Sequence, residues 1–233
     1  MCVADGWAKV NRRHFTSLFA ACIAVAFAGE QEAMAQNGSS ELLAAAEAGN
    51  VAEAQRLLKA GAKVDVRDNR RRTPLMIAVQ RGDAALARVL VEAGADINAQ
   101  DNIKDSPFLL AGARGDVAIL KLLIPKGPDY SKVNRYGGSA LIPAAERGHV
   151  EAVRLLVETG SPVNHINRLG WTALLEAVIL GDGGEAHQKI LEILIAGGAD
   201  VNIPDGDGVS ALTHARQRGF TQMEKILLAA GAR

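Results

Sequence analysis

The chain has 233 residues, with 26 Lys and Arg against 26 Asp and Glu, so its formal net charge is zero at pH 7. This balance gives no general attraction to nucleic acid or to an anionic membrane, and we expect neither as a partner. Cys2 and Cys22 both precede residue 36. Residues 36–233 therefore cannot form a disulfide with one another or a cysteine-based metal site.

Residues 1–35 have the pattern of a signal peptide that is cleaved after Ala35. Arg12 and Arg13 precede the apolar run Leu18–Ala28, which is too short to span a bilayer comfortably. Ala33-Met34-Ala35 then supplies the small-X-small pattern of a cleavage site. We expect a mature chain that starts at Gln36 and is periplasmic or secreted. The alternative is a hydrophobic N-terminal helix that packs on the first repeat.

The export route is left open by the residues around the paired arginines. The segment Asn11–Phe15 resembles a twin-arginine signal, but Asn11 replaces the usual Ser or Thr, so a general secretory signal is the alternative. Cys22 lies in a faint lipoprotein-like box, but more apolar sequence follows it, which argues against lipidation.

From residue 39 onward the sequence is a repeat with a 33-residue period. A Ser or Thr recurs at steps of 33, 33, 33, 33 and 38, and a glycine follows each one after nine residues. These Ser and Thr residues are Ser40, Thr73, Ser106, Ser139, Thr172 and Ser210. A fixed period of this length predicts a repeat array, with six units over residues 39–68, 69–101, 102–133, 134–166, 167–205 and 206–233.

The second unit shows what one repeat is expected to form. Thr73 is predicted to cap a short helix that begins at Pro74 and ends at Gly82. Asp83 is predicted to cap a second helix, which ends at Gly94 before a turn or short hairpin. The same capping role is expected at the equivalent positions Asn50, Asp116, His149 and Asp182. Helices of about eight to ten residues do not persist alone, so the units must stack into a solenoid.

The motifs Thr73-Pro74-Leu75, Gly94–Asn98 and Gly198–Asn202 closely resemble the pattern of the ankyrin repeat family. The resemblance covers about residues 39–233 and implies an all-α, ankyrin-type solenoid of about six helix-turn-helix repeats with short hairpin-like turns. It also implies protein–protein interaction, with no particular partner. Two features depart from the pattern. The family favours a histidine three residues after the repeated Ser or Thr, and here that position holds Met76, Leu109, Ile142, Leu175 or Thr213. Arg71 and Lys104 replace the turn glycine of the family.

The third and fifth units are irregular. Gly112 lies inside a predicted helix of the third unit, and Pro125 shortens the helix that follows. The fifth unit carries five extra residues within Asp182–Lys189, where Gly183 and Gly184 predict a longer loop between its two helices.

No set of residues predicts catalysis, a cofactor or a bound metal, so we expect a protein that is not an enzyme. His149, His165, His187 and His214 show no metal-ligand spacing. The segment Asp205–Gly208 faintly resembles a calcium loop but lacks the later ligands that such a loop needs, and it fits the turn of the repeat.

The predicted function is binding of a protein partner along the turn tips and the concave helix face. Exposed aromatic residues and arginines dominate binding energy at interfaces, which favours the tips. The tip residues assigned to partner binding are Arg70, Arg72, Ile103, Arg135, Tyr136, Arg168, Leu169 and Trp171. For Trp171, packing on the neighbouring tip is an equal alternative.

An arginine stands just before the mid-unit glycine in four of the units, and stacking is expected to align these arginines into a basic row. They are Arg81, Arg114, Arg147 and Arg218. A cation at a helix C-terminus is favourable by about 0.3–1 kcal/mol on its own, which is the alternative explanation. With the tip arginines, the row predicts an acidic or mixed-charge protein segment as partner. The sequence thus indicates an exported, monomeric binding protein. An inhibitor or immunity-type protein and a stress-defence accessory protein are the alternatives.

Overall fold

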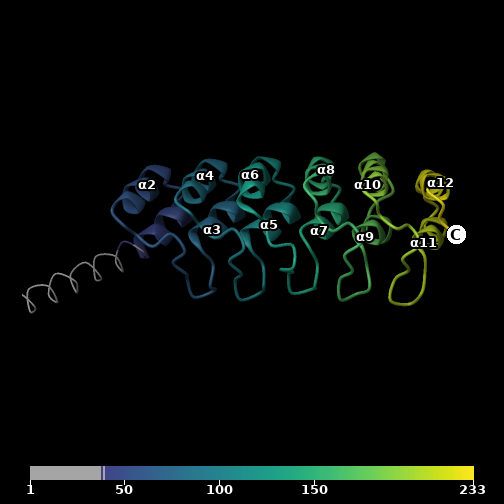
Figure 1. Cartoon of the computed structure of the whole chain (residues 1–233), viewed down its shortest axis with the longest axis horizontal. Helices are drawn as coiled ribbons and strands as arrows, with labels where there is room; N and C mark the ends of the chain where they lie inside the picture. The colour runs from purple at the N-terminus through teal and green to yellow at the C-terminus, as the bar shows by residue number, and fades with distance from the viewer. Residues whose placement is uncertain (1–37, 39) are drawn as a thin grey trace, which may run out of the picture.

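The computed structural model describes Gly38 and residues 40–233, and this part of the chain is helical with no strand. Figure 1 shows two rows of helices side by side, with the turns between units below them. After a first helix over residues 40–48, the inner row contains α3 (Pro74–Arg81), α5 (Pro107–Arg114), α7 (Leu141–Glu146), α9 (Ala173–Ile179) and α11 (Ala211–Gln217). The outer row contains α2 (Val51–Lys59), α4 (Ala84–Glu92), α6 (Val117–Leu123), α8 (Val150–Glu158), α10 (Glu185–Ala196) and α12 (Thr221–Ala229).

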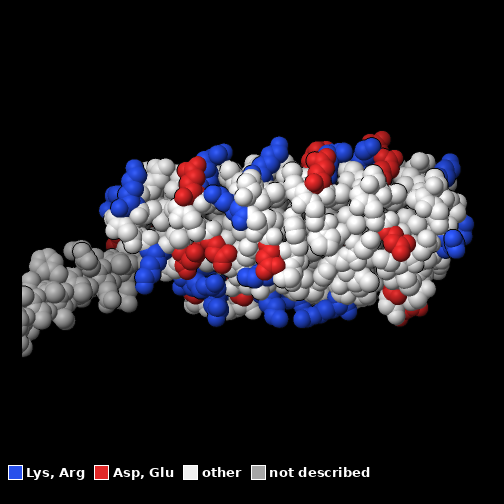
Figure 2. All heavy atoms as spheres, in the orientation of Figure 1, with Lys and Arg blue, Asp and Glu red and all other residues white. Residues whose placement is uncertain are grey.

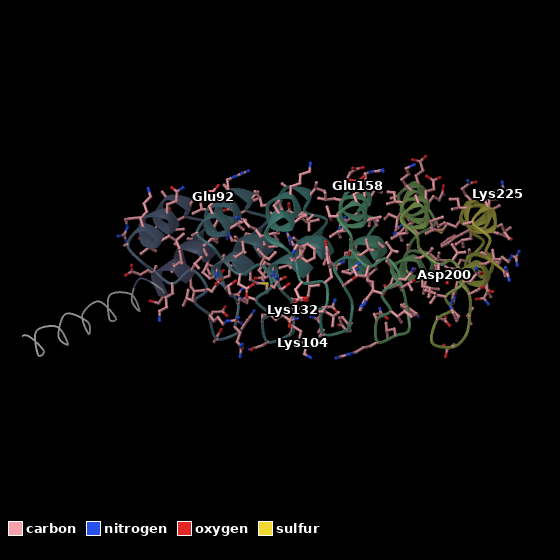
Figure 3. All side chains as sticks on the ribbon, in the orientation of Figure 1. Glu92, Lys104, Lys132, Glu158, Asp200 and Lys225 are labelled. Atoms are coloured by element: carbon pink, nitrogen blue, oxygen red, sulfur yellow. The ribbon has the colours of Figure 1, made fainter. Side chains whose placement is uncertain are left out.

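The predicted all-α solenoid is confirmed, and small residues allow its inner helices to approach closely. The alanines at one position of each inner helix from α3 to α11 have no exposed surface; they are Ala78, Ala111, Ala144, Ala177 and Ala215. Figure 3 shows how the rows separate at the surface: Glu92 and Glu158 lie at the outer helices, whereas Lys104 lies at a turn. Within the described residues, no helix has the length and apolarity needed to cross a membrane.

The inner-helix caps follow the repeated Ser and Thr with two exceptions. The Thr73 hydroxyl accepts from the Met76 amide, and Ser106, Thr172 and Ser210 make the same bond in their units. Ser139 does not, because α7 begins after Ala140, and the buried Ser139 hydroxyl has no hydrogen-bond partner. The chain is already helical at Ser40, so this residue is not a cap either.

The outer-helix caps are as predicted at Asn50, Asp83 and Asp116, whose side chains accept from the third residue beyond. His149 is at the N-cap position of α8, but its ring makes no capping bond. The ring packs against Gly115 of the preceding unit instead, 2.4 Å from where a Cβ on that glycine would be. The prediction that Asp182 caps the next helix is wrong, since Gly184 precedes α10.

The five extra residues of the fifth unit lie between α9 and α10, as predicted, but they are not all loop. Helix α10 has 12 residues, whereas α8 has nine. The Asp182 carboxylate accepts from the Gly184 amide and from His187 Nδ1, each at 2.8 Å. The insertion therefore lengthens the outer helix at its start and leaves the stack intact.

The residues that replace the turn glycine keep its backbone conformation, and the irregular residues of the third unit have local structural effects. Arg71 and Lys104 adopt positive φ angles of 62° and 63°, the conformation that Gly170 adopts in a later turn. Gly112 lies in α5 where a Cβ would be 2.7 Å from the Ala140 Cβ, so this glycine lets α5 and α7 come together. Pro125 ends the regular part of α6 at Leu123, and a 3-10 turn, η1 (Ile124–Lys126), follows.

Candidate functional site

Three exposed apolar side chains occupy equivalent places in three successive turns. Ile103, Tyr136 and Leu169 are spaced by 33 residues and are 46%, 56% and 54% exposed. The repeat brings them into line, and we call them the apolar ridge. Its ends are different in charge, because the equivalent residue is Arg70 in the turn before the ridge and Asp207 in the turn after it.

A groove of about 420 Å³ lies beside the ridge, over α5, α7 and α9. We call it the central groove. Its rim includes Tyr136 and Leu169 of the ridge, and Leu180 adds a further apolar side chain that is 49% exposed. Figure 2 shows Lys and Arg gathered along the edge where the turns lie, with largely uncharged surface over the middle units. The groove is thus bounded by apolar and cationic side chains together.

The acidic side chains of the central groove were not assigned to partner binding by the sequence analysis. They are Asp105 in a turn, Glu146 at the end of α7 and Glu176 within α9. Burial raises the pKa of Asp105, and Asp101 adds to this, while Arg135 and Arg147 oppose it. Glu176 could have been found by aligning the units, since it replaces Ile77, Leu110 and Pro143 at one inner-helix position.

Glu176 is the most buried acid of the groove, with 5% of its surface exposed. Its Oε1 accepts a 2.9 Å hydrogen bond from the Asn167 amide, and no described group bonds to its Oε2. Burial of the carboxylate, with repulsion from Glu146, raises the pKa of Glu176 to about 7, although the Asn167 bond acts in the opposite direction. Asn167 is held in place because its Oδ1 accepts from the Leu169 and Trp171 amides.

Arg135 and Arg168, two of the predicted tip residues, interact with their own surroundings. The Arg135 guanidinium lies 4.6 Å from the centre of the Tyr136 ring and 3.7 Å from Asp105. Arg168 donates to the Arg135 carbonyl at 2.7 Å, which ties adjacent turns together. Both remain exposed, and Arg135 lines the central groove.

Three further tip residues that were predicted to bind a partner differ in exposure; they are Arg70, Arg72 and Trp171. Arg70 is exposed at the turn. Arg72 is largely enclosed, and its guanidinium binds Asp68, Glu47 and Gln80. Trp171 is half-buried and packs against the hydrophobic core.

The predicted basic row is built from arginines that link successive units. Arg81 donates to the Glu47 carbonyl and Arg147 to the Ala113 carbonyl, both at 2.7 Å and both at the end of the preceding inner helix. The Arg114 guanidinium lies over Gly82, 3.4 Å from where a Cβ would be. The favourable contact of a cation with a helix C-terminus therefore applies, but to the helix of the neighbouring unit. Of these arginines, Arg147 lines the central groove.

The histidines are dispersed through the described residues, and no three His, Cys, Asp or Glu side chains there gather into a metal-binding group. His165 Nε2 is 2.6 Å from the Gly137 carbonyl, and His187 Nε2 is 2.9 Å from the Glu146 carbonyl. His214 Nε2 is 2.7 Å from Asp205 Oδ2. Each therefore makes a contact between units or within a turn.

Comparison with known proteins agrees with the architecture. A family model described as ankyrin repeats in three copies matches residues 20–101 and 108–205. The chain belongs to the ankyrin repeat family, whose fold is a protein-interaction scaffold. Over 57 residues it is 42% identical to the ankyrin repeat protein YahD of Escherichia coli (strain K12), a match that spans 24% of this chain and 28% of that one.

Solved structures extend the similarity to most of the chain. An ankyrin repeat domain from Acinetobacter baumannii AYE is 49% identical, with a TM-score of 0.81 over 83% of this chain and 98% of that one. The ankyrin repeat protein EF0377 is 43% identical, with a TM-score of 0.80 over 82% and 97%. The ankyrin repeat domain of Bcl-3, a member of the IkappaB family, is 29% identical, with a TM-score of 0.74 over 82% and 86%.

Proposed function

We propose that this protein binds a protein segment of mixed charge along the apolar ridge and the central groove. The observation that carries the proposal is the alignment of Ile103, Tyr136 and Leu169, each about half exposed, beside a groove of about 420 Å³. Aromatic and aliphatic side chains next to a pocket are the usual anchors of an interface. Arginines at the rim and acids at the floor supply contacts for both signs of charge.

Photocrosslinking in cells tests the docking face directly. The photoreactive residue p-benzoylphenylalanine replaces Tyr136 or Leu169 in separate variants. Leu228 is the matched control, because it is an apolar residue of the outer helix α12 that is 45% exposed. We expect a specific adduct, identified by mass spectrometry, from positions 136 and 169 and none from position 228. Equal labelling from all three positions, or adducts from position 228 alone, would contradict the proposal.

The same experiment bears on the expected monomer. An adduct between two copies of this chain at position 136 would show that the ridge is a self-association surface. We propose instead that the partner is a different protein, so that size-exclusion chromatography with light scattering gives the mass of one chain.

We propose export for the same protein on the pattern of residues 1–35, which lie outside the described residues. The proposal predicts that protein recovered from cells begins at Gln36. Mass spectrometry of the N-terminal peptide measures this, and a recovered chain that retains Met1 in the cytoplasmic fraction would contradict it.

A further inference from the structure

The second and fifth units differ in the residue that they place beside an acid of the preceding unit. Glu146 lies three periods, or 99 residues, beyond Glu47, and Trp171 lies the same distance beyond Arg72. In the second unit the Arg72 guanidinium binds the Glu47 carboxylate. In the fifth unit the tryptophan cannot do so, and no described cation pairs with Glu146.

The fifth unit also adds a second carboxylate at this place. Glu176 occupies the position of Ile77, which is 1% exposed in the second unit. The partner of Glu176 is the neutral amide of Asn167, whose equivalent is Asp68, which pairs with Arg72 at 2.7 Å. In the last unit the equivalent contact joins the His214 ring to the Asp205 carboxylate at 2.7 Å. Glu146 and Glu176 thus lie near enough to repel each other, and no cation among the described residues pairs with either.

The other charges on elements packed against α9 do not supply that cation. Those of α10 and α11 are engaged elsewhere: His187 with Asp182, Lys189 with Glu192, His214 with Asp205, and Arg216 with Glu224. Glu185 in the first turn of α10 is a further acid and is exposed. Within the groove, Arg135 lies closest to Asp105, and Arg147 donates to the Ala113 carbonyl.

We infer that the central groove receives a basic side chain, arginine or lysine, from the partner segment, and that this cation lies between Glu146 and Glu176. A buried carboxylate with a free oxygen is costly unless a cation or donor reaches it, so a partner that supplies one gains specificity as well as attraction. Arg135 covers one face of the Tyr136 ring, but the side chain is 56% exposed, so the rest of it suits the stem or face of a second arginine. The inference rests on the proposed docking function and names the side chain that the groove selects.

Binding of such a cation is linked to the ionisation of Glu176. Desolvation by burial and repulsion from Glu146 raise the pKa of Glu176 to about 7, so a fraction of the molecules carries a proton there at neutral pH. An incoming cation favours the ionised carboxylate and displaces that proton. Affinity for the basic segment should therefore fall as the pH drops below 7, by at most about tenfold for each pH unit.

Selection from a displayed library of random 12-residue peptides against the purified protein tests the inference. We expect the selected peptides to share an arginine or lysine at one position. A synthetic selected peptide should lose about 30-fold in affinity when that residue is replaced by citrulline or glutamine, as expected for breaking a desolvated charge pair. Glu146→Gln and Glu176→Gln should cause a similar loss, and Glu176→Gln should also abolish the fall in affinity between pH 8 and pH 6.

Controls separate this inference from the proposed function. Glu158→Gln changes an exposed acid on the outer helix α8 and should leave binding unchanged. If Tyr136→Ala and Leu169→Ala weaken binding but both glutamate variants bind normally, the docking face is correct and the basic side chain is wrong. If neither pair of variants affects binding, or if no peptide is enriched, both proposals fail. Circular dichroism of each variant shows whether it is folded.

Discussion

The second and fifth units share one backbone plan and use it for different purposes. In the second unit, the positions around the turn form a closed network, because Arg72 joins Asp68, Gln80 and Glu47. In the fifth unit, the arginine is replaced by Trp171, and two acids face the groove without a cation. The difference shows that a repeat fold tolerates the exchange of a turn with paired charges for one with unpaired acids, since neighbouring inner helices hold the backbone in either case.

The backbone of the two turns provides the largest expected difference. Gly170 is equivalent to Arg71, but a Cβ on Gly170 would be 2.7 Å from the Gly206 amide nitrogen. We expect Gly170→Ala to lower the free energy of unfolding by about 3 kcal/mol, through the clash and a positive φ. Gly208→Ala is the control, because its φ is 80° but nothing lies within 4 Å. Urea denaturation measures the free energy of unfolding of both variants. An equal loss in Gly170→Ala and Gly208→Ala would contradict the clash.

The buried acid of the fifth unit should make stability depend on pH. The pKa of Glu176 is raised to about 7 in the folded protein, so folding favours the protonated carboxyl. The resulting contribution to the free energy of unfolding is complete below about pH 4.5 and is lost as the pH rises through 7. Glu176→Gln removes this loss and should stabilise the protein by about 2 kcal/mol at pH 8, with little effect at pH 4.5. Thermal denaturation at the two pH values measures this. Glu158→Gln should change stability at neither pH. If Glu176→Gln stabilises the protein equally at pH 4.5 and pH 8, the pKa of Glu176 is not shifted as stated.

Opening the closed network of the second unit should have a smaller and opposite effect. Arg72→Met keeps the length of the side chain and leaves Asp68 and Glu47 without their cation, so we expect a loss of about 1.5 kcal/mol at pH 7. Arg70→Met, at an exposed position of the same turn, should change stability by less than about 0.5 kcal/mol. The denaturant concentration at the midpoint of unfolding measures both effects. Equal effects of Arg72→Met and Arg70→Met would show that the network does not stabilise the turn.

The smallest expected effect is again in the turn of the second unit. Arg71 has a φ of 62°, which a glycine adopts without cost. Arg71→Gly should therefore stabilise the protein by about 0.5–1 kcal/mol. Arg70→Gly, which has no positive φ to relieve, should be neutral or destabilising. A loss of stability on Arg71→Gly would mean that the arginine side chain contributes more than the strain costs.

Much of the fold could be predicted because its signals are local. The Thr73 cap, the Pro at the first helical position and the glycines that end helices act within a few residues, and each is found as expected in the second unit. The failures at Ser139 and Asp182 lie where a helix begins later than expected, α7 after Ala140 and α10 after Gly184. The role of Gly112 could not be predicted, because it depends on how closely Ala140 of the next unit approaches.

The candidate site was predicted in part for the same reason. The period placed Ile103, Tyr136 and Leu169 at turn tips, and the structure shows them exposed and in line. The burial of Glu176 and its distance from a cation depend on contacts between α7, α9 and the turn that contains Asn167. A formal charge of zero over the whole chain gave no indication of that local imbalance.

The sequence by itself determined the array: its period, the pair of helices in each unit, the turns and the residues at their tips. These follow from short-range preferences that repeat every 33 residues. Tertiary structure alone decided which charges are neutralised. Arg72, Arg81 and Arg147 each reach the preceding unit, so their charges are used within the array. Glu146 and Glu176 have no such arginine, although packing of adjacent units brings both to the lining of the central groove, near enough to repel each other.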